Sequence, residues 1–153
     1  MTTMHATDTF HFAGNLLRLR TRTADTDGKF SLVEVRTAPG AGAPPNRHPG
    51  ENEAFYVVTG RFEFVMEGEA TTVGAGEFVR IPNGALHSFR NVGPEAGTML
   101  ITIWPGSGHD TFFSEAGEPM PSGTTAFPAP SGPPDIAKVK AIGQRCGIEF
   151  ILD

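Results

Sequence analysis

Short stretches in which apolar and polar residues alternate recur along the first hundred residues of the chain. They are NLLRLRTRT, FSLVEVRT, EAFYVVT, RFEFVME, EATTV, EFVRIP, LHSFRNV and TMLITIW. Turn-forming pairs separate them, among them Asp27-Gly28, Glu67-Gly68 and Asn83-Gly84. Short strands at this spacing are typical of an antiparallel sandwich or barrel. We therefore predict an all-β fold, with a hairpin over residues 61–73 that turns at Glu67-Gly68.

The pattern changes after Trp104. Residues 111–116 have room for one helical turn, and residues 118–134 then contain six prolines. Proline lacks a backbone N–H and has a fixed φ, so it interrupts helices and sheets. This density of proline predicts an extended arm or lid without regular structure.

A short helix is predicted after the proline-rich segment. Asp135 can cap its start, and apolar residues recur at helical spacing before Gly147, where the helix ends. These apolar residues are Ile136, Val139 and Ile142. The last apolar run, IEFIL, predicts a final strand. We expect one domain over residues 1–153, with a barrel core at about 14–105 and the arm, helix and strand at about 106–153.

Charge and composition exclude several kinds of partner. The net charge is −5 and lysine and arginine form no cluster, so the chain lacks the electrostatic footprint of a nucleic-acid-binding protein. No run approaches the roughly 20 apolar residues that span a bilayer, and MTTMHATDTFHF lacks the apolar core of a secretory signal. Cys146 is the only cysteine, which fits a reducing compartment. We therefore expect a cytoplasmic protein that binds neither nucleic acid nor membrane.

Two blocks of residues have the spacing of a binding site. In the first, His48 is followed after four residues by Glu53, and after six more by Gly60. The second block consists of Gly76, Pro82, Gly84, His87 and Asn91. Glycine and proline have a structural use at turns. The candidates for chemistry are therefore His48, Glu53 and His87.

The two blocks, 15 residues apart, resemble the paired motifs of the cupin superfamily. The tail from FFSEAGEPMP to CGIEFIL is similar to small single-domain cupins grouped with quercetin 2,3-dioxygenases. The second block agrees at every defining position, whereas the first has Asn46 where the family pattern has a histidine. The resemblance implies a jelly-roll barrel, or double-stranded β-helix, with a divalent transition metal inside it and dioxygenase chemistry.

Strand geometry supports a metal at these residues. Side chains alternate faces along a strand, so Glu53 shares the inner face with Phe55 and Val57. A carboxylate buried among apolar side chains is costly unless a cation lies beside it. With His48 and His87 it forms a triad of two imidazoles and one carboxylate that leaves coordination positions open. This donor set suits Fe(II) best, with Ni, Mn and Zn as alternatives.

Asn46 departs from the family pattern, and three roles are open for it. Its amide oxygen is a weak, neutral ligand, so it can coordinate loosely, bond to a metal-bound water, or face solvent. The triad is complete without it. We expect the substitution Asn46→His to tighten metal binding, because it restores an imidazole at that position.

The other polar residues near the motifs are expected to lie outside the site. Glu51 is two residues from Glu53, but the spacing of the first block selects Glu53, so we place Glu51 in a solvated loop. His5 and His11 are predicted to lie in a surface arm. His109 precedes the predicted helical turn, where exposure to solvent is the favoured interpretation and contact with the barrel mouth the alternative.

These observations predict a metal-dependent dioxygenase that acts on a small apolar or aromatic, flavonol-like molecule. Glu53 is the predicted catalytic residue, as a ligand, as a base for a substrate hydroxyl, or as both in turn. The alternatives are isomerase or lyase chemistry on a sugar or keto acid, and a binding module without catalysis. We also predict a homodimer, as in many cupins, because NLLRLRTRT has no obvious local partner strand.

Overall fold

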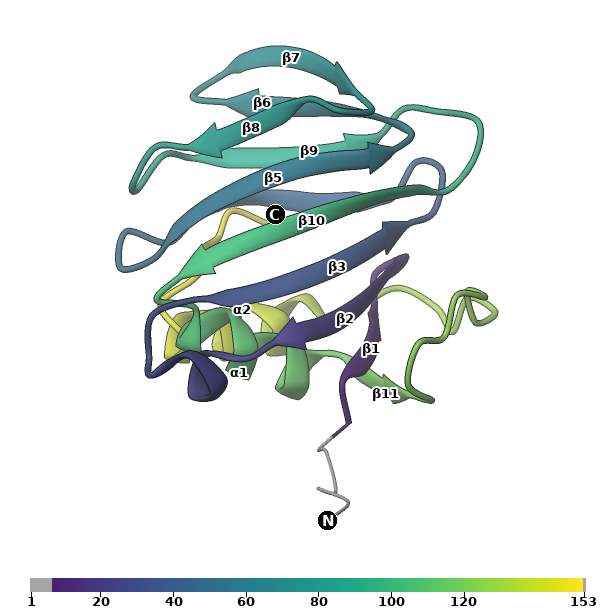
Figure 1. Ribbon diagram of the computed structural model, residues 1–153. Coiled ribbons are helices and arrows are strands. Elements are labelled where there is room, and N and C mark those ends of the chain that lie inside the picture. The colour runs from purple at the N-terminus through teal and green to yellow at the C-terminus, as the bar shows by residue number, and fades with distance from the viewer. Residues whose placement is uncertain (1–6, 153) are drawn as a thin grey trace.

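Two antiparallel β-sheets form the body of the protein in the computed structural model, which describes residues 7–152 (Figure 1). The larger sheet has the strand order β11 (Glu118–Met120), β1 (Thr9–Phe12), β2 (Asn15–Thr21), β3 (Ser31–Thr37), β10 (Gly97–Trp104), β5 (Asn52–Thr59) and β8 (Phe78–Ile81). The smaller sheet has the order β12 (Glu149–Phe150), β4 (Gly42–Arg47), β9 (His87–Asn91), β6 (Arg61–Met66) and β7 (Glu69–Gly74). The prediction of an all-β fold is confirmed.

Alternation along the strands directs the apolar side chains into one core between the sheets. In β3, Val33 and Val35 are fully buried, whereas Glu34 between them is only partly buried. Met99 and Ile103 of β10, the neighbouring strand, are also fully buried. Each such side chain contributes roughly 1.5–3 kcal/mol to folding through removal from water. The predicted inner face of β5 is also confirmed, since Phe55 and Val57 are buried together with Glu53.

The predicted hairpin over residues 61–73 is confirmed as β6 and β7. The two strands pair up to Met66 and Glu69, which leaves Glu67 and Gly68 as the turn. Both turn residues have positive φ, 48° and 85°. A two-residue turn of this kind matches the right-handed twist of its strands, so the local sequence fixes the register of the hairpin.

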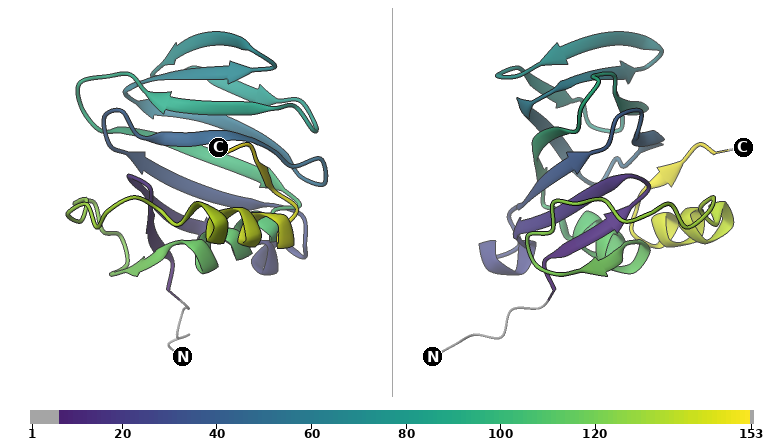
Figure 2. Two further views of the ribbon diagram at one scale, coloured as in Figure 1. Left: turned by 180° about the vertical axis from the view of Figure 1, so that it is seen from behind. Right: turned by 90° about the vertical axis from the view of Figure 1, so that its right-hand side faces the viewer.

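The residues after β10 fold against one end of the two sheets, as both views in Figure 2 show. Helix α1 (Ser107–Ala116) contacts β1, β11, the 3-10 turn η1 (Thr23–Thr26) and α2 (Ile136–Arg145), which also contacts β12. Together they bury a second apolar cluster. It contains Phe112, Val139, Ile142, Ile148 and Phe150. The C-terminal segment therefore covers the end of the barrel rather than extending away from it.

Two expectations for this segment are wrong. Helix α1 has ten residues instead of a single turn at 111–116. Strand β11 lies inside the proline-rich segment and pairs with β1; proline is tolerated there because β11 is an edge strand. The α2 prediction is confirmed, since the Asp135 side chain accepts a hydrogen bond from the Lys138 backbone N–H as an N-cap. The predicted last strand is reduced to β12.

The N-terminal predictions also need correction. His11 lies in β1, which pairs with both β11 and β2, so it is not part of a surface arm; His5 lies outside the described residues. The NLLRLRTRT stretch forms β2, which pairs with β1 and β3. The unpaired edge on which the homodimer prediction relied is therefore absent. Within residues 7–152, neither helix combines the length and apolarity needed to cross a membrane.

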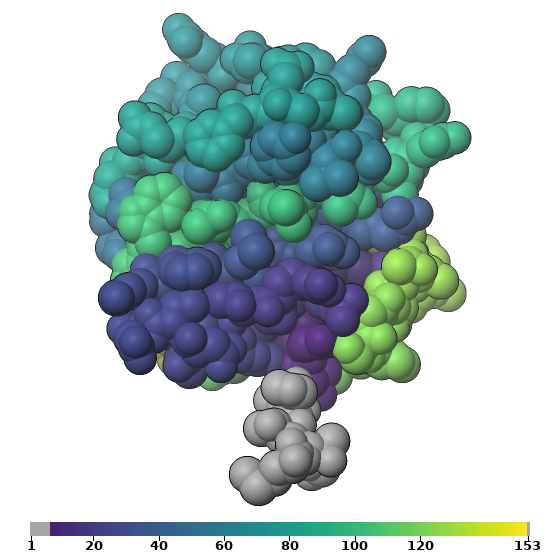
Figure 3. All heavy atoms as spheres, in the orientation of Figure 1, coloured from purple at the N-terminus to yellow at the C-terminus, as the bar shows by residue number. Residues whose placement is uncertain are grey.

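We propose that the predicted homodimer forms through exposed apolar side chains on the outer face of the larger sheet. Tyr56, Val58, Phe78 and Trp104 are 44, 42, 64 and 36% exposed, and Figure 3 shows this face of the molecule. Apolar patches of this kind commonly mark protein contacts. We predict a dimeric mass for the wild type by light scattering at micromolar concentration and a monomeric mass for Phe78→Ser. A monomeric wild type contradicts the prediction.

Candidate metal centre

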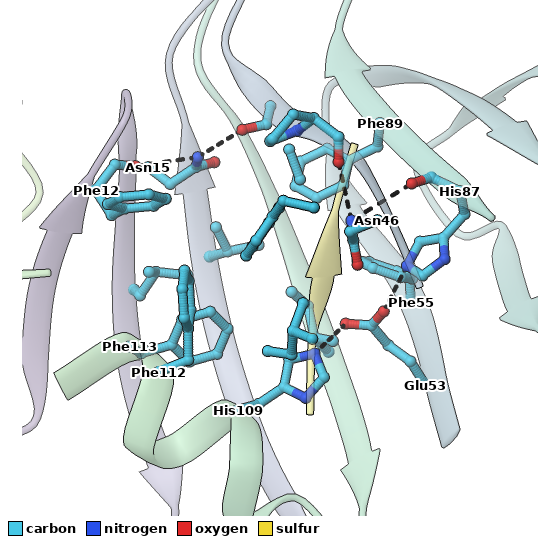
Figure 4. Close-up of a pocket in the computed structure, with 18 residues that line it drawn as sticks. Phe12, Asn15, Asn46, Glu53, Phe55, His87, Phe89, His109, Phe112 and Phe113 are labelled. Atoms are coloured by element: carbon cyan, nitrogen blue, oxygen red, sulfur yellow. Dashed lines mark hydrogen bonds and ion pairs between the residues drawn. The ribbon is translucent and has the colours of Figure 1, made fainter. Parts of the chain in front are cut away.

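A cavity of about 70 Å³ lies between the two sheets, and side chains of α1 line one side of it. Six phenylalanines line it, which are Phe12, Phe55, Phe89, Phe112, Phe113 and Phe150. Polar side chains gather at one end of this apolar space, where Asn46, Glu53, His87 and His109 meet (Figure 4). The cavity therefore combines an aromatic wall with a cluster of side chains that could bind a metal.

The structure brings together Glu53 and His87 from two strands and His48 from the end of a third. His48 follows β4, Glu53 lies in β5 and His87 begins β9. One carboxylate oxygen of Glu53, Oε1, lies 3.1 Å from Nε2 of His48 and 3.1 Å from Nε2 of His87. All three side chains are buried, and their donor atoms lie within 4.8 Å of one another. The two motif blocks therefore converge at one point.

The hydrogen bonds that Nδ1 of His48 and Nδ1 of His87 make determine whether the Nε2 atoms facing Glu53 carry a proton in the neutral rings. Nδ1 of His48 donates to the backbone carbonyl of Glu51 at 2.8 Å, and Nδ1 of His87 donates to that of Ala85 at 2.8 Å. A carbonyl only accepts, so in both neutral rings the proton is on Nδ1 and the lone pair is on Nε2. Two lone pairs and a carboxylate oxygen then face one another. Only protons or a cation between them can relieve that repulsion, and the donor set fits a divalent metal.

In the absence of a metal, protons hold the cluster together. Burial alone would raise the pKa of Glu53, but the hydrogen bonds from His48 and His87 and the positive charge of His109 hold it well below its usual range. Burial likewise opposes a charge on His48, yet the adjacent Glu53 raises the pKa of His48 above its ordinary value. The Glu53 carboxylate therefore favours the protonated form of His48.

Protons and a metal ion would compete for the same imidazole nitrogens, so the stabilisation of the protein by metal should depend on pH. The raised pKa of His48 contributes stability below about pH 6.5 that is lost as pH rises through the folded-state pKa. The lowered pKa of Glu53 contributes stability that is lost only in strong acid. A metal needs deprotonated imidazoles, so we expect the gain in Tm on adding saturating Zn(II) to be larger at about pH 8 than at about pH 5.5. Differential scanning calorimetry measures both values; an equal gain contradicts the expectation.

Asn46 does not face solvent, so one of its three predicted roles is excluded. It is 6% exposed, and its Nδ2 donates to the carbonyl of Pro44 at 2.9 Å and, more weakly, to that of His87 at 3.4 Å. Figure 4 shows the amide oxygen on the other side of the group, directed toward the His87 ring and Phe55. Loose coordination and a bond to a metal-bound water both remain compatible with this position.

The position of Asn46 sharpens the prediction for Asn46→His. The imidazole would enter the buried space that the amide now fills, at the polar end of the cavity. We expect tighter binding of Zn(II) or Ni(II) in a competitive titration, because an imidazole is a stronger donor than an amide. His48→Ala provides the loss control. An unchanged affinity in the histidine variant, with a clear loss in the control, would show that position 46 is not directed at the metal.

The structure contradicts the expected places of Glu51 and His109. Glu51 is 7% exposed and His109 is 5% exposed, so neither lies in solvent. Oε1 of Glu51 accepts a hydrogen bond from Nδ1 of His109 at 2.7 Å and one from its backbone N–H at 3.0 Å. Nε2 of His109 lies 3.9 Å from Oε2 of Glu53. A third imidazole therefore reaches the cluster, from α1.

Comparisons with known proteins agree with this geometry. Residues 33–104 match the family model described as a cupin domain. The polyketide synthase CurC of Streptomyces cyaneus is 36% identical over 80 residues, which cover 52% of this chain and 51% of that protein. Quercetin 2,3-dioxygenase of Bacillus subtilis strain 168 is 26% identical over 95 residues, which cover 62% of this chain and 28% of that protein. The match thus spans about half or less of these curated relatives.

A solved structure extends the likeness to the fold. The polyketide cyclase RemF from Streptomyces resistomycificus superposes with a TM-score of 0.55 at 26% identity, over 69% of this chain and 80% of that one. Taken with the two sheets and the two motif blocks, these findings show that the protein has an all-β fold and that residues 33–104 are similar to cupin domains. The chain resembles quercetin 2,3-dioxygenase, and it is also similar to proteins of polyketide synthesis.

Proposed function

We propose that this protein is a metal-dependent enzyme that acts on an apolar molecule of the polyketide or polyphenol kind, and that it closes a ring in a chain of alternating carbonyls. One observation carries the proposal: Glu53 and His87, two of three buried side chains that could hold a metal, line the polar end of a cavity that six phenylalanines also line. Such a site suits a substrate with an apolar body and a pair of oxygens at one end. His48, Glu53 and His87 would hold the ion, with Fe(II), Ni, Mn and Zn as candidates.

Similarity to proteins of polyketide synthesis favours ring closure as the reaction. CurC is the curated relative with the higher identity, and RemF is a polyketide cyclase of similar fold. A divalent ion bound here would supply Lewis-acid polarisation of a carbonyl. Ring closure further needs a base that takes a proton from the carbon between two carbonyls, after which a C–C bond forms to a third carbonyl and water leaves. Oε2 of Glu53, which makes no hydrogen bond to His48 or His87 and lies 3.9 Å from Nε2 of His109, would take that proton.

The size of the cavity restricts how a ring can bind. Its 70 Å³ is roughly half of the ~150 Å³ cavity that holds one benzene in a protein interior. Phe112 and Phe113 line the cavity from α1. We therefore propose that these two side chains move outward when an aromatic substrate enters. The same apolar walls disfavour a sugar, whose hydroxyls would lack hydrogen-bond partners.

Dioxygenation is the second candidate, and the similarity to quercetin 2,3-dioxygenase supports it. A flavonol also presents two neighbouring oxygens on an aromatic body, so the same cavity and donors suit it. The two reactions differ in their need for oxygen. Ring closure proceeds under argon and releases water, whereas dioxygenation consumes one O₂ for each substrate molecule.

The test uses the purified protein loaded with one metal at a time. A synthetic aryl tetraketone, in which a carbon between two carbonyls can close a six-membered ring onto a more distant carbonyl, is incubated under argon and analysed for the dehydrated ring product by mass spectrometry. A flavonol is incubated in air with an oxygen electrode. We expect metal-dependent ring formation that Glu53→Gln abolishes and that the surface variant Glu69→Gln retains. Oxygen uptake with the flavonol alone would favour the second candidate. Metal binding without either conversion would overturn the proposal in favour of a binding module.

A further inference from the structure

We infer that His109 of α1 is a fourth protein ligand of the metal and takes the role of the histidine that the family pattern has at position 46, where this chain has Asn46. We also infer that Glu51 positions His109. The inference rests on the metal centre proposed above and adds a ligand that the two motif blocks do not contain. Its basis is the convergence of three buried imidazoles on one carboxylate, with the third arriving from outside the barrel strands.

Glu51 fixes the orientation of His109 tightly. Oε1 of Glu51 accepts from both the ring Nδ1 and the backbone N–H of His109, and Oε2 accepts from the backbone N–H of Gly106. The carboxylate is thus bound to the start of α1 through both oxygens. The backbone carbonyl of the same residue accepts from Nδ1 of His48. One residue therefore orients two of the three imidazoles, as carboxylates and carbonyls beside metal-bound histidines commonly do.

Close approach of α1 to Glu51 depends on a glycine. A Cβ at Gly108 would lie 2.8 Å from Oε1 of Glu51 and 2.3 Å from the backbone oxygen of Cys146. Both contacts are too short for a side chain there. The sequence Gly106-Ser107-Gly108-His109 therefore lets the helix start against the carboxylate and brings the imidazole into the barrel.

The bond to Glu51 also determines which nitrogen faces the cluster. A carboxylate only accepts, so Nδ1 of His109 carries the proton and the lone pair of the neutral ring is on Nε2. That atom lies 3.9 Å from Oε2 of Glu53. Figure 4 shows the ring directed at Glu53 from the side opposite His87. His48, His87 and His109 thus all present Nε2, the state required of a metal ligand.

Nε2 of each barrel histidine lies 3.1 Å from Oε1 of Glu53, and Nε2 of His109 lies 3.9 Å from the other oxygen, Oε2. Two donors bonded to one tetrahedral Zn(II) at about 2.1 Å lie roughly 3.4 Å apart. The set of donor atoms within 4.8 Å of one another contains His48, Glu53 and His87, so His109 lies beside this set, and a small movement of its ring would bring Nε2 to the ion. The rings of His48 and His109 have centroids 4.5 Å apart and are perpendicular, so both can point at a common centre without clashing.

The experiment compares Zn(II) affinity by competition with a chromophoric chelator, together with the visible spectrum of the Co(II)-loaded protein. The variants are His109→Ala, Glu51→Gln, His48→Ala and, as a matched control on β1, His11→Ala. We expect His109→Ala to lower affinity roughly 10–100-fold or more and to change the Co(II) spectrum. Glu51→Gln should produce a smaller loss with a shifted spectrum, and His11→Ala should match the wild type.

The outcomes separate this inference from the proposed function. A wild type that binds no metal overturns both. A wild type that binds metal and loses it in His48→Ala, while His109→Ala keeps wild-type affinity and spectrum, overturns the fourth ligand alone. If His109→Ala fails to fold, X-ray absorption of the Zn(II)-loaded wild type counts the imidazoles directly: three support the inference and two overturn it.

Discussion

Glu53→Gln is expected to lower the affinity for Zn(II) or Ni(II) by roughly 100-fold or more, because loss of a direct ligand should exceed the 10–100-fold effect typical of outer-shell partners. The substitution removes the negative charge that contacts both barrel histidines through one oxygen. It retains the size of the side chain. The new amide group can donate to an Nε2 lone pair that faces it. At about pH 8, where the stabilising effect of the raised His48 pKa is lost, we therefore expect the metal-free variant to keep a Tm close to that of the wild type.

Two measurements on the same samples check this expectation. Equilibrium dialysis against buffered free Zn(II) gives the affinity, and thermal unfolding of the metal-free protein gives Tm. Glu69→Gln on β7, where the side chain is exposed, is the matched control and should behave like the wild type. Wild-type affinity in Glu53→Gln would exclude Glu53 as a ligand. A large fall in metal-free Tm would instead show that the hydrogen bonds of the carboxylate are needed for folding.

The barrel and the motif histidines were predictable because the relevant information is local. Alternation within β3 and β10 identifies their inner faces, and the Glu67-Gly68 pair fixes the β6–β7 hairpin. The spacing within each motif block depends on strand and turn lengths that recur throughout the fold family. His48 and His87 come together because β4 and β9 are neighbours in the smaller sheet.

The Glu51–His109 pair was not predictable in the same way. The two residues are 58 positions apart, and α1 has no periodic contact with β5 that a sequence pattern would reveal. One signal was present. Glu51 lies two residues before Glu53, which puts it on the same face if the strand is extended backward. A buried inner face at this position implies a second carboxylate at the end of the barrel, and a buried carboxylate needs a hydrogen-bond donor or a cation beside it.

The Glu51–His109 pair offers an explanation for Asn46 at the position where the family pattern has a histidine. The family pattern draws a histidine from β4, next to His48, whereas this chain has a third imidazole from α1. The C-terminal segment is then part of the metal site as well as its cover. Stability of the segment and affinity for the metal should consequently be coupled.

Phe112→Ala tests that coupling and should cause the largest loss of stability among the substitutions considered. Phe112 is 2% exposed and lies between Phe12 of β1 and Phe150 of β12, with ring centroids 5.7 and 5.2 Å away. Removing a buried phenylalanine costs about 3–5 kcal/mol, against a total of roughly 5–15 kcal/mol for a domain. Because α1 also carries His109, we expect weaker Zn(II) binding in the same variant.

Urea unfolding of metal-free protein, followed by circular dichroism, measures the change. We expect one urea transition at a lower midpoint, because a single cooperative domain loses its cover and its barrel together. Thermal unfolding of the same samples should give a Tm lower by roughly 6–20 °C. Ile136→Ala is the control, since that residue of α2 is 40% exposed and should shift the midpoint little. Two separate transitions would show that the C-terminal segment unfolds independently of the barrel. Unchanged Zn(II) affinity in a destabilised variant would show that the position of α1 does not affect the metal, so that the cover and the site are independent features of the fold.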